Sequence, residues 1–342
     1  MKYTPKYTVT PKLLDNIKQI TKIKTELNNK RFPTTIKMHL EKSAVSLSVH
    51  SSTSIEGNPL PLTEVKKILK SKPKHARDSE KEVLNYNDAL VYLGKLLDQK
   101  VKIGDELVQN IHKKVVKDLL PKEKSGSYRD VPVVVNDPRT GETVYLPPNV
   151  QDVGKLMDAL LDYINKNGDG VDPVLLAGLF HKQFVIIHPF ADGNGRTARL
   201  LTKLLLANMG LDTFNLFSFE NYYNSNVTKY FQNVGVLGDY YEINEDIDFT
   251  EWLEYFTDGI IDELLRVSGE LKKVGVDPGS TLKKHHKDIL KYIEKHGFIT
   301  DSDYAELTDR AKSTRALDFD KLINLDLIRR KGKGRATHYV LK

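Results

Sequence analysis

Between residues 188 and 199 the sequence gathers groups that can bind phosphate. The segment reads His-Pro-Phe-Ala-Asp-Gly-Asn-Gly-Arg-Thr-Ala-Arg. Gly193 and Gly195 have no Cβ, so the backbone of this turn can curl and present its N–H groups to an anion. A helix that begins at about Asn194 would add free N–H groups and its dipole at the same point. The sequence therefore predicts an anion hole at this turn.

Other side chains of the segment extend the chemistry. Arg196 and Arg199 are three residues apart, hence on one helix face, where they would bind the oxygens of a di- or triphosphate. Asp192 suits a Mg²⁺ ion held between phosphates. His188 can take a proton near neutral pH, and Phe190 would be an anchor buried beneath the loop. Each of these residues, taken alone, more often has a purely structural role. Their combination in one segment is far more specific for phosphate chemistry.

Two common alternatives for this segment are excluded by its residue types. No Gly-Lys-Ser/Thr follows the turn, so it is not a Walker loop. The acidic ligand positions of an EF-hand are also missing.

The elements that must position this turn are mostly helices. One β-hairpin interrupts them, formed by Val131 to Val135, a turn over 136–141, and Thr143 to Tyr145. An isolated hairpin is marginal alone, so it must lie on the helical body. Apolar residues at helical spacing predict helices over 11–32, 36–57, 63–70, 79–98, 105–120, 150–165, 172–185, 194–209, 220–234 and 249–272.

The segment 188–199 resembles the Fic family signature, His-x-Phe-x-Asp/Glu-Gly-Asn-Gly-Arg-x-x-Arg, and matches it at every defined position. Gly-x-Tyr-Arg at 126–129 and Tyr-x-Pro-Pro at 145–148 are similar to the flanks of that family's flap. The similarity covers roughly 36–272. It implies a mainly α fold, a Fic-type helical bundle with a β-hairpin flap. It also implies transfer of AMP from ATP, with Mg²⁺, to a Tyr, Thr or Ser hydroxyl of a target protein.

The resemblance also implies a role for each matching residue. His188 would be the base that activates the target hydroxyl for attack on the α-phosphate. Asp192 would bind Mg²⁺, and Gly193–Gly195 would cradle the phosphates. Arg196 and Arg199 would hold the outer phosphates, with pyrophosphate leaving. Such chemistry needs positioning and charge stabilisation more than covalent help.

Partners follow from the same resemblance. The flap, 131–145, would pair with a segment of the target protein by strand addition. Tyr230 lies on the later helix where the family stacks the adenine, and core packing is the competing interpretation of that residue. Self-AMPylation and a homodimer are two further partner expectations.

A second motif, Ser-x-x-x-Glu-Gly at 52–57, is similar to the family's inhibitory-helix motif, which places that helix at about 36–57. A carboxylate at a helix C-terminus opposes the dipole, which favours a specific partner for Glu56. Glu56 could reach Arg199 and occupy the charge meant for the γ-phosphate. The alternative is an ordinary helix end with Glu56 in water. Glu56 could also position a water that removes AMP from a modified target.

The C-terminal end carries the whole net charge of +6. Residues 281–342 contain 10 Lys and 5 Arg against 7 Asp and 2 Glu, while the first 280 residues balance at 37 and 37. After a linker at 274–280 the order helix–helix–helix–hairpin resembles a winged helix-turn-helix. Residues 313–325 would be its recognition helix and 329–335 its wing. The residues expected to face DNA phosphates are Lys312, Arg315, Arg330, Lys331, Lys333 and Arg335.

Duplex DNA is one of several partners left open for this end of the chain. Asp318 and Asp320 on the expected third helix do not favour DNA. Dimerisation or target docking is the alternative use of such a module.

Length and composition agree with this division. The 342 residues, 39% of them hydrophobic, suffice for about two domains or slightly more. We expect a helical region at 1–104 that carries the inhibitory helix, a catalytic core at 105–275, and the winged-helix domain at 281–342. There is no cysteine, which excludes disulfides and thiolate metal sites. The absence of a signal-like or membrane-spanning run predicts a cytoplasmic location without a membrane partner.

Three functions from different classes remain: an AMP transferase, a nucleotide-sensing DNA-binding regulator, and a transferase of another phosphate-bearing group, as in relatives that resemble Doc. The complete motif at 188–199 favours the first over the third.

Overall fold

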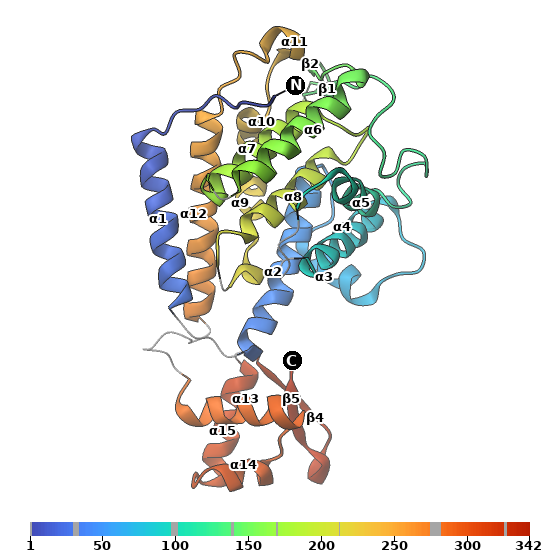
Figure 1. Ribbon diagram of the computed structural model, residues 1–342. Coiled ribbons are helices and arrows are strands. Elements are labelled where there is room, and N and C mark those ends of the chain that lie inside the picture. Colours follow the sequence, from blue (N-terminus) through green and yellow to red (C-terminus); the bar gives the residue numbers. More distant parts are fainter. Residues whose placement is uncertain are drawn as a thin grey trace.

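The computed structural model describes residues 2–29, 34–96, 102–137, 140–168, 170–211, 213–273, 282–324 and 327–342, and helices dominate it (Figure 1). The mainly α fold predicted from the sequence is confirmed. None of the helices in these ranges is long and apolar enough to cross a membrane. The helices up to residue 273 are α1 (Pro11–Asn28), α2 (Thr34–Ile55), α3 (Leu62–Ser71), α4 (Asp78–Gly94), α5 (Asp105–Val115), α6 (Val150–Asn167), α7 (Pro173–Ile187), α8 (Asn194–Ala207), α9 (Glu220–Ser225), α10 (Val227–Val234), α11 (Tyr240–Ile243) and α12 (Thr250–Lys273).

Helix α7 lies at the centre of the body because it is apolar on every face. Nearly all of its residues are buried, which is typical of a helix enclosed by others. Asp172 caps its start by accepting the N–H of Val174 at 2.8 Å, and Pro173 holds the first helical position. Helices α6, α8 and α12 pack around it (Figure 1). Helix α7 therefore gives a fixed base to the turn that follows it.

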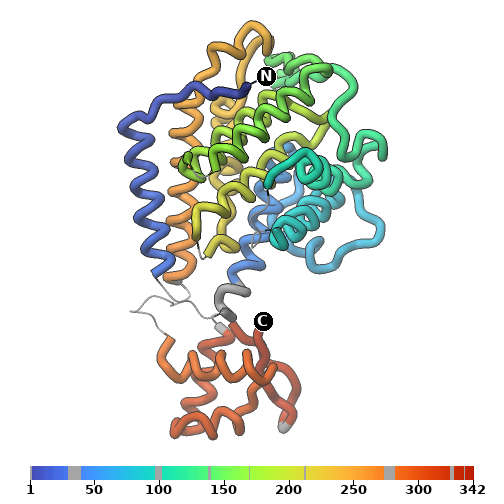
Figure 2. The backbone as a smooth tube through the Cα atoms, viewed as in Figure 1, coloured from blue at the N-terminus to red at the C-terminus, as the bar shows by residue number. Residues whose placement is uncertain are grey.

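The two long helices α1 and α12 lie side by side on one flank, so the start of the chain packs against a segment far along it (Figure 2). Asn16 donates to Thr257 Oγ1 at 2.9 Å and to Asp258 Oδ1 at 2.8 Å, and Lys12 Nζ lies 3.0 Å from Asp258 Oδ2. These contacts fix the N-terminal helix to the helical body.

Helix α2 contacts the body through small polar side chains. Ser48, Ser51, Ser52 and Thr53 are buried. Ser48 Oγ lies 3.0 Å from Glu220 Oε2 and accepts from Lys203 Nζ at 3.1 Å. The helix ends at Ile55, and Gly57 has a φ of +89°, the left-handed conformation that glycine often adopts just after a helix.

The predicted hairpin is present, but it is shorter than expected. Strand β1 (Val135–Asn136) pairs antiparallel with β2 (Thr143–Leu146), and β2 pairs parallel with β3 (Gly238–Asp239). Residues 131–134 are not in a strand because Pro132 has no N–H to give to a ladder. Strand β3 was not predicted, since two residues carry no periodic signal.

Several helix boundaries also differ from prediction, and two of the differences affect the description most. Helix α5 ends at Val115 rather than near 120, and Asp118 beyond it has a φ of +57°. The segment 220–234 is two helices, because Asn226 leaves the helical conformation and caps α10 by accepting the N–H of Lys229 at 3.0 Å.

The C-terminal residues form α13 (Lys284–His296), α14 (Asp301–Leu307), α15 (Lys312–Asn324) and the hairpin of β4 (Ile328–Lys331) with β5 (His338–Leu341). This element order is the predicted one. Phe319 stacks on Tyr339 with ring centroids 3.9 Å apart, which joins α15 to the hairpin. The predicted linker, 274–280, and the side chain of Arg335 lie outside the described residues. The winged-helix identity of this segment stays a prediction.

Arg315 does not face solvent as the DNA prediction requires. Its guanidinium makes two 2.9 Å hydrogen bonds to the carboxylate of Asp301 and donates to the carbonyl of Arg310. Asp318 is also internal, since it accepts from Tyr304 and from Arg310. Sequence spacing could not distinguish these internal ion pairs from a free surface. Arg315 is therefore removed from the set of phosphate-contacting residues.

Candidate functional site

The turn between α7 and α8 is held in a conformation that few residues accept. His188 ends α7 in the left-handed region with a φ of +50°, and its N–H donates to the carbonyl of Phe184 at 3.0 Å. Gly193 has a φ of +77°, and a Cβ there would lie 2.8 Å from Val116 Cγ1. Glycine is therefore required at 193 for both backbone and space.

Asn194 and Phe190 fasten the loop to itself. The side chain of Asn194 accepts the N–H of Phe190 at 2.9 Å and donates to its carbonyl at 2.8 Å. Phe190 is fully buried, as predicted, and stacks on His112 with ring centroids 3.6 Å apart and planes 1° apart. The predicted phosphate contact of Asn194 can involve only its backbone in this arrangement, because its side chain is used inside the loop.

His112 is a positioning residue that the sequence did not reveal. Its Nδ1 accepts the N–H of Gly126 at 3.0 Å, so the neutral ring carries its proton on Nε2, which donates to the carbonyl of Asp192 at 2.9 Å. Burial lowers the pKa of His112 to about 4, which keeps the ring neutral near pH 7. A single histidine some 76 positions before the motif carries no sequence signal for this role.

Arg129 connects both ends of the flap to the same turn. Its Nε donates to the carbonyl of His188 at 2.9 Å, and its backbone N–H donates to the carbonyl of Pro189 at 2.9 Å. Its Nη2 donates to the carbonyl of Pro148 beyond the hairpin. The Gly-x-Tyr-Arg motif was expected only as a flank of the flap, and its arginine is also a support of the loop.

His188 is oriented to act through one ring nitrogen. Nδ1 lies 3.2 Å from the carbonyl of Val185, which can only accept, so Nδ1 carries the proton of the neutral ring. Among the described residues Nε2 has no hydrogen-bond partner. Burial lowers the pKa of His188, so the ring is neutral at pH 7 and Nε2 can accept a proton.

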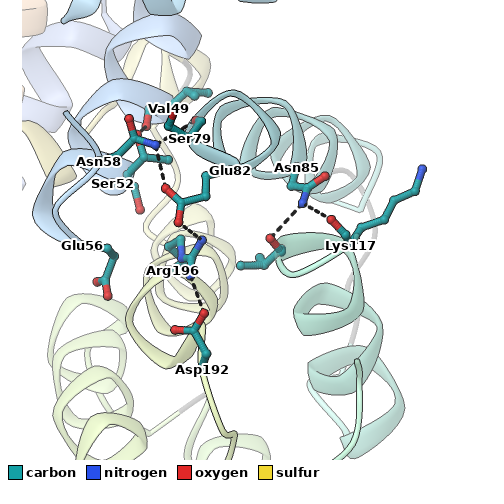
Figure 3. A network of polar contacts seen from close by, with 12 residues as sticks. Val49, Ser52, Glu56, Asn58, Ser79, Glu82, Asn85, Lys117, Asp192 and Arg196 are labelled. Carbon is teal, nitrogen blue, oxygen red and sulfur yellow. Dashed lines mark hydrogen bonds and ion pairs between the residues drawn. The ribbon is translucent and has the colours of Figure 1, made fainter. Parts of the chain in front are cut away.

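Arg196 lies between two carboxylates (Figure 3). Its Nη2 is 3.1 Å from Asp192 Oδ2, and its Nη1 is 3.3 Å from Glu82 Oε1 on α4. Arg196 is 2% exposed, whereas the side chain of Asp192 is 55% exposed at the rim of the turn. Glu82 was not predicted, because nothing in the sequence relates it to a motif more than a hundred residues later.

Arg199 is fully buried and is contacted by the end of α2. Its Nη2 lies 2.8 Å from Glu56 Oε1, the predicted contact, and its Nε donates to Ser52 Oγ at 2.7 Å. The Glu56 carboxylate raises the pKa of Arg199. A Cβ on Gly195 would lie 2.2 Å from Glu56 Oε1. The carboxylate therefore rests on the first turn of α8, where the anion hole was predicted.

Tyr230 is placed in the core, where an adenine cannot stack on it. The residue is 1% exposed, and its hydroxyl lies 2.8 Å from His181 Nε2 and 3.5 Å from Arg199 Nη1. Stacking on an adenine would need an open ring face, so this assignment is corrected to a buried support of Arg199. The next residue, Phe231, is 38% exposed and is the better candidate, because adjacent positions on a helix differ by about 100° in direction.

Comparisons with known proteins agree with the motif. Residues 102–206 match the model of the Fic/DOC family. A curated "Protein adenylyltransferase Fic" from Nematostella vectensis is 35% identical over 175 residues, which are 49% of this chain and 39% of that protein. The one from Drosophila melanogaster is 32% identical over 174 residues, 50% of this chain and 34% of that protein. The chain thus spans well under half the length of these relatives.

Solved structures have a similar fold, in one case over nearly the whole chain. A crystal structure of a Fic family protein from Desulfovibrio desulfuricans G20 has a TM-score of 0.66 at 21% identity and covers 99% of this chain and 98% of its own. A structure of Fic-1 from C. elegans has a TM-score of 0.61 at 22% identity and covers 76% of this chain and 73% of its own. At these identities the likeness concerns the fold.

Proposed function

Since this chain carries a Fic/DOC family domain at residues 102–206, we propose that it transfers AMP from ATP to a Tyr, Thr or Ser hydroxyl of a target protein. One observation carries the proposal. A neutral His188, whose Nε2 has no hydrogen-bond partner in the described part of the chain, adjoins the glycine turn at the start of α8, and Arg196 and Arg199 follow on that helix.

His188 is the general base of the proposed reaction. Its Nε2 takes the proton of the target hydroxyl as the hydroxyl oxygen forms a bond to the α-phosphorus of ATP. The bond from that phosphorus to the bridging oxygen breaks, and pyrophosphate leaves with the electron pair. The hydrogen bond from Nδ1 to the Val185 carbonyl fixes the ring, so the base needs no reorientation.

The phosphates of ATP would bind at the α8 N-terminus. The N–H groups of Gly193–Gly195 and the side chains of Arg196 and Arg199 supply positive charge there. The exposed carboxylate of Asp192 at the rim is the type of ligand Mg²⁺ takes together with phosphate oxygens. Mg²⁺ bound by Asp192 would offset the negative charge of the phosphates.

Glu56 inhibits this site at rest. Its carboxylate neutralises Arg199 and occupies the space over Gly195, so the outer phosphates of ATP would meet a negative charge there. ATP would then bind in a pose that does not react.

The test of the transferred group is intact-mass spectrometry of the Glu56→Gly protein after incubation with Mg²⁺ and ATP, alone and with candidate target proteins. A gain of one AMP supports an adenylyltransferase. A gain of one phosphate points to a transferase of another phosphate-bearing group, and no adduct with bound ATP points to a nucleotide sensor.

Removal of AMP is a second reaction that the same site supports. Glu56 lies partly exposed beside Gly195, where its carboxylate could orient a water against a bound AMP ester. A target carrying AMP should then lose it with the wild-type protein and keep it with Glu56→Gly. Loss at equal rates with both would contradict this role.

Target binding is proposed at the flap. Strand β1 is the edge of its sheet, and Val131 and Val134 beside it are exposed, which suits pairing with an extended segment of a target. Self-AMPylation and a homodimer stay predictions.

Polyanion binding is proposed for the C-terminal hairpin because Arg329, Arg330, Lys331 and Lys333 are all exposed on it. A shift of labelled duplex DNA that weakens steeply with salt would support this. Equal binding to a protein that ends at residue 281 would contradict it.

A further inference from the structure

Arg196 has a second acidic partner whose position depends on the α2–α3 turn. Glu82 contacts Arg196 through Oε1, while its Oε2 accepts from Asn58 Nδ2 at 2.6 Å. Figure 3 shows the resulting chain from Asn58 through Glu82 and Arg196 to Asp192. Asn58 follows Glu56 by two residues, so one short turn contacts Arg199 directly and Arg196 through Glu82.

Asn58 is itself firmly placed. Its Nδ2 also donates to the carbonyl of Ser79 at 2.8 Å, its Oδ1 accepts the N–H of Leu60 at 3.1 Å, and its own N–H donates to the carbonyl of Thr53 at 3.1 Å. Asn58 thus joins the end of α2 to the start of α4, and its amide holds Glu82 against Arg196. Displacing the turn would remove that support.

The contact between Glu82 and Arg196 is an ion pair without a good hydrogen bond. Nε and Nη1 of Arg196 are buried and have no hydrogen-bond partner within the described part of the chain. Buried donors without acceptors are unfavourable. Phosphate oxygens would satisfy these donors better than Glu82 does, so the carboxylate is a replaceable partner.

We propose that Asn58 and Glu82 form a second latch on the resting site, so that displacement of residues 56–58 releases Arg196 and Arg199 together. This rests on the proposed nucleotide-binding function. At rest three carboxylates, Glu56, Glu82 and Asp192, surround two guanidinium groups. The excess negative charge opposes ATP, and withdrawal of the turn would take Glu56 from Arg199 and the Asn58 support from Glu82, so that Glu82 can leave Arg196.

The first test is the affinity for ATP with Mg²⁺, measured by calorimetry on the full chain. Glu82→Gln should bind about threefold to tenfold more tightly than wild type, the range expected for one partly buried ion pair. In the Glu56→Gly background the gain in ATP affinity from Glu82→Gln should fall below about twofold, since the turn at 56–58 is already released from the site. Asp88→Asn removes an exposed acid of the same helix and should change nothing. Weaker or unchanged binding by Glu82→Gln overturns the latch.

The second test needs no nucleotide. Amide hydrogen exchange at Asn58 and Leu60 should be at least about threefold faster in Glu82→Gln than in wild type or Asp88→Asn, because Asn58 loses a charged acceptor. Unchanged exchange overturns the latch. If Glu56→Gly transfers no AMP while exchange and ATP affinity change as expected, the proposed reaction fails and the latch stands.

Asn58→Asp tests the hydrogen bond between Asn58 and Glu82 with almost no change in side-chain shape. The carboxylate keeps an acceptor for the N–H of Leu60 but repels Glu82 instead of donating to it. It should reproduce the tighter ATP binding of Glu82→Gln. Wild-type affinity in Asn58→Asp would overturn the link between the turn and Arg196.

Discussion

The turn between α7 and α8 and the turn between α2 and α3 contact each other, but they are stabilised differently. The α7–α8 turn is fixed by hydrogen bonds from the side chains of Asn194, His112 and Arg129 to its backbone and by a glycine that packs against Val116. The α2–α3 turn reaches the site through Glu56 and through Asn58 acting on Glu82. The first is suited to hold one geometry, and the second to be displaced by a competing anion or partner.

The helix that carries the second turn supports this difference. Among its described residues, α2 combines hydroxyl contacts to Lys203 and Glu220 with only a few buried large apolar side chains, whereas nearly all of α7 is buried. Hydrogen bonds between small polar groups cost little to exchange for others, whereas apolar packing is lost outright. A shift of α2 is therefore less costly than a shift of α7.

The largest expected effect concerns the fixed turn. His188→Ala in the Glu56→Gly background should lower the rate of AMP transfer by about 10²–10⁴-fold, the usual contribution of a general base. ATP affinity should stay the same, because His188 contacts no phosphate in the proposed reaction. Rates come from label incorporated into target protein. His75→Ala, which changes an exposed histidine, is the control, and undiminished labelling by His188→Ala would refute the base assignment.

Asn194→Ala should destabilise the α7–α8 turn while leaving its charged side chains unchanged. The N–H and the carbonyl of Phe190 would be left buried without partners, which costs about 2–4 kcal/mol of unfolding free energy. Urea unfolding measures this, with Asn208→Ala at an exposed position at the other end of α8 as control. A loss of unfolding free energy equal to that of Asn208→Ala would show that the Asn194 side chain does not stabilise the loop.

The neutral His112 makes the fixed turn sensitive to acid. Its pKa is lowered to about 4 in the folded state, so between about pH 6.5 and 4 the unfolded chain binds a proton that the folded chain does not. The free energy of unfolding should therefore decrease as the pH is lowered through that window, by up to about 3 kcal/mol. His112→Gln cannot titrate and should lose less stability between pH 7.5 and 4.5. Parallel losses in both proteins would contradict the assignment.

The smallest expected effects separate internal from surface charges at the C-terminal end. Arg315→Ala should lower the unfolding free energy, because its two bonds to Asp301 are lost. Arg329→Ala should leave stability unchanged and reduce the salt slope of DNA binding by about 1. If Arg315→Ala alone changed the slope, the hairpin would not be the polyanion surface.

The predictability of these features follows from where their determinants lie in the chain. The α7–α8 turn is contiguous, so its histidine, glycines and arginines are visible together in the sequence. Glu56 was also predictable, because a carboxylate at a helix end before Gly57 needs a partner. Both depend on local geometry that residue types determine.

The features of the site that the sequence did not predict depend on packing between segments that are far apart in the chain. His112, Glu82 and the loop contact of Arg129 come from other elements, and only the assembled bundle brings them to the turn. Tyr230 was assigned to the wrong role because its burial is set by how α10 rotates against α7 and α12. Arg315 was misassigned for the same reason, since Asp301 reaches it from another helix.

The central claim is that a complete catalytic turn is held inactive by a displaceable carboxylate. The most direct measurement is the initial rate of AMP transfer by wild type and by Glu56→Gly at the same concentrations of ATP, Mg²⁺ and target. Removing the Glu56 carboxylate from Arg199 should make the variant faster by about tenfold or more, although loss of the partner of a fully buried guanidinium lowers the unfolding free energy. Equal rates per folded molecule, with the folded fraction of each protein measured by urea unfolding, would contradict the claim.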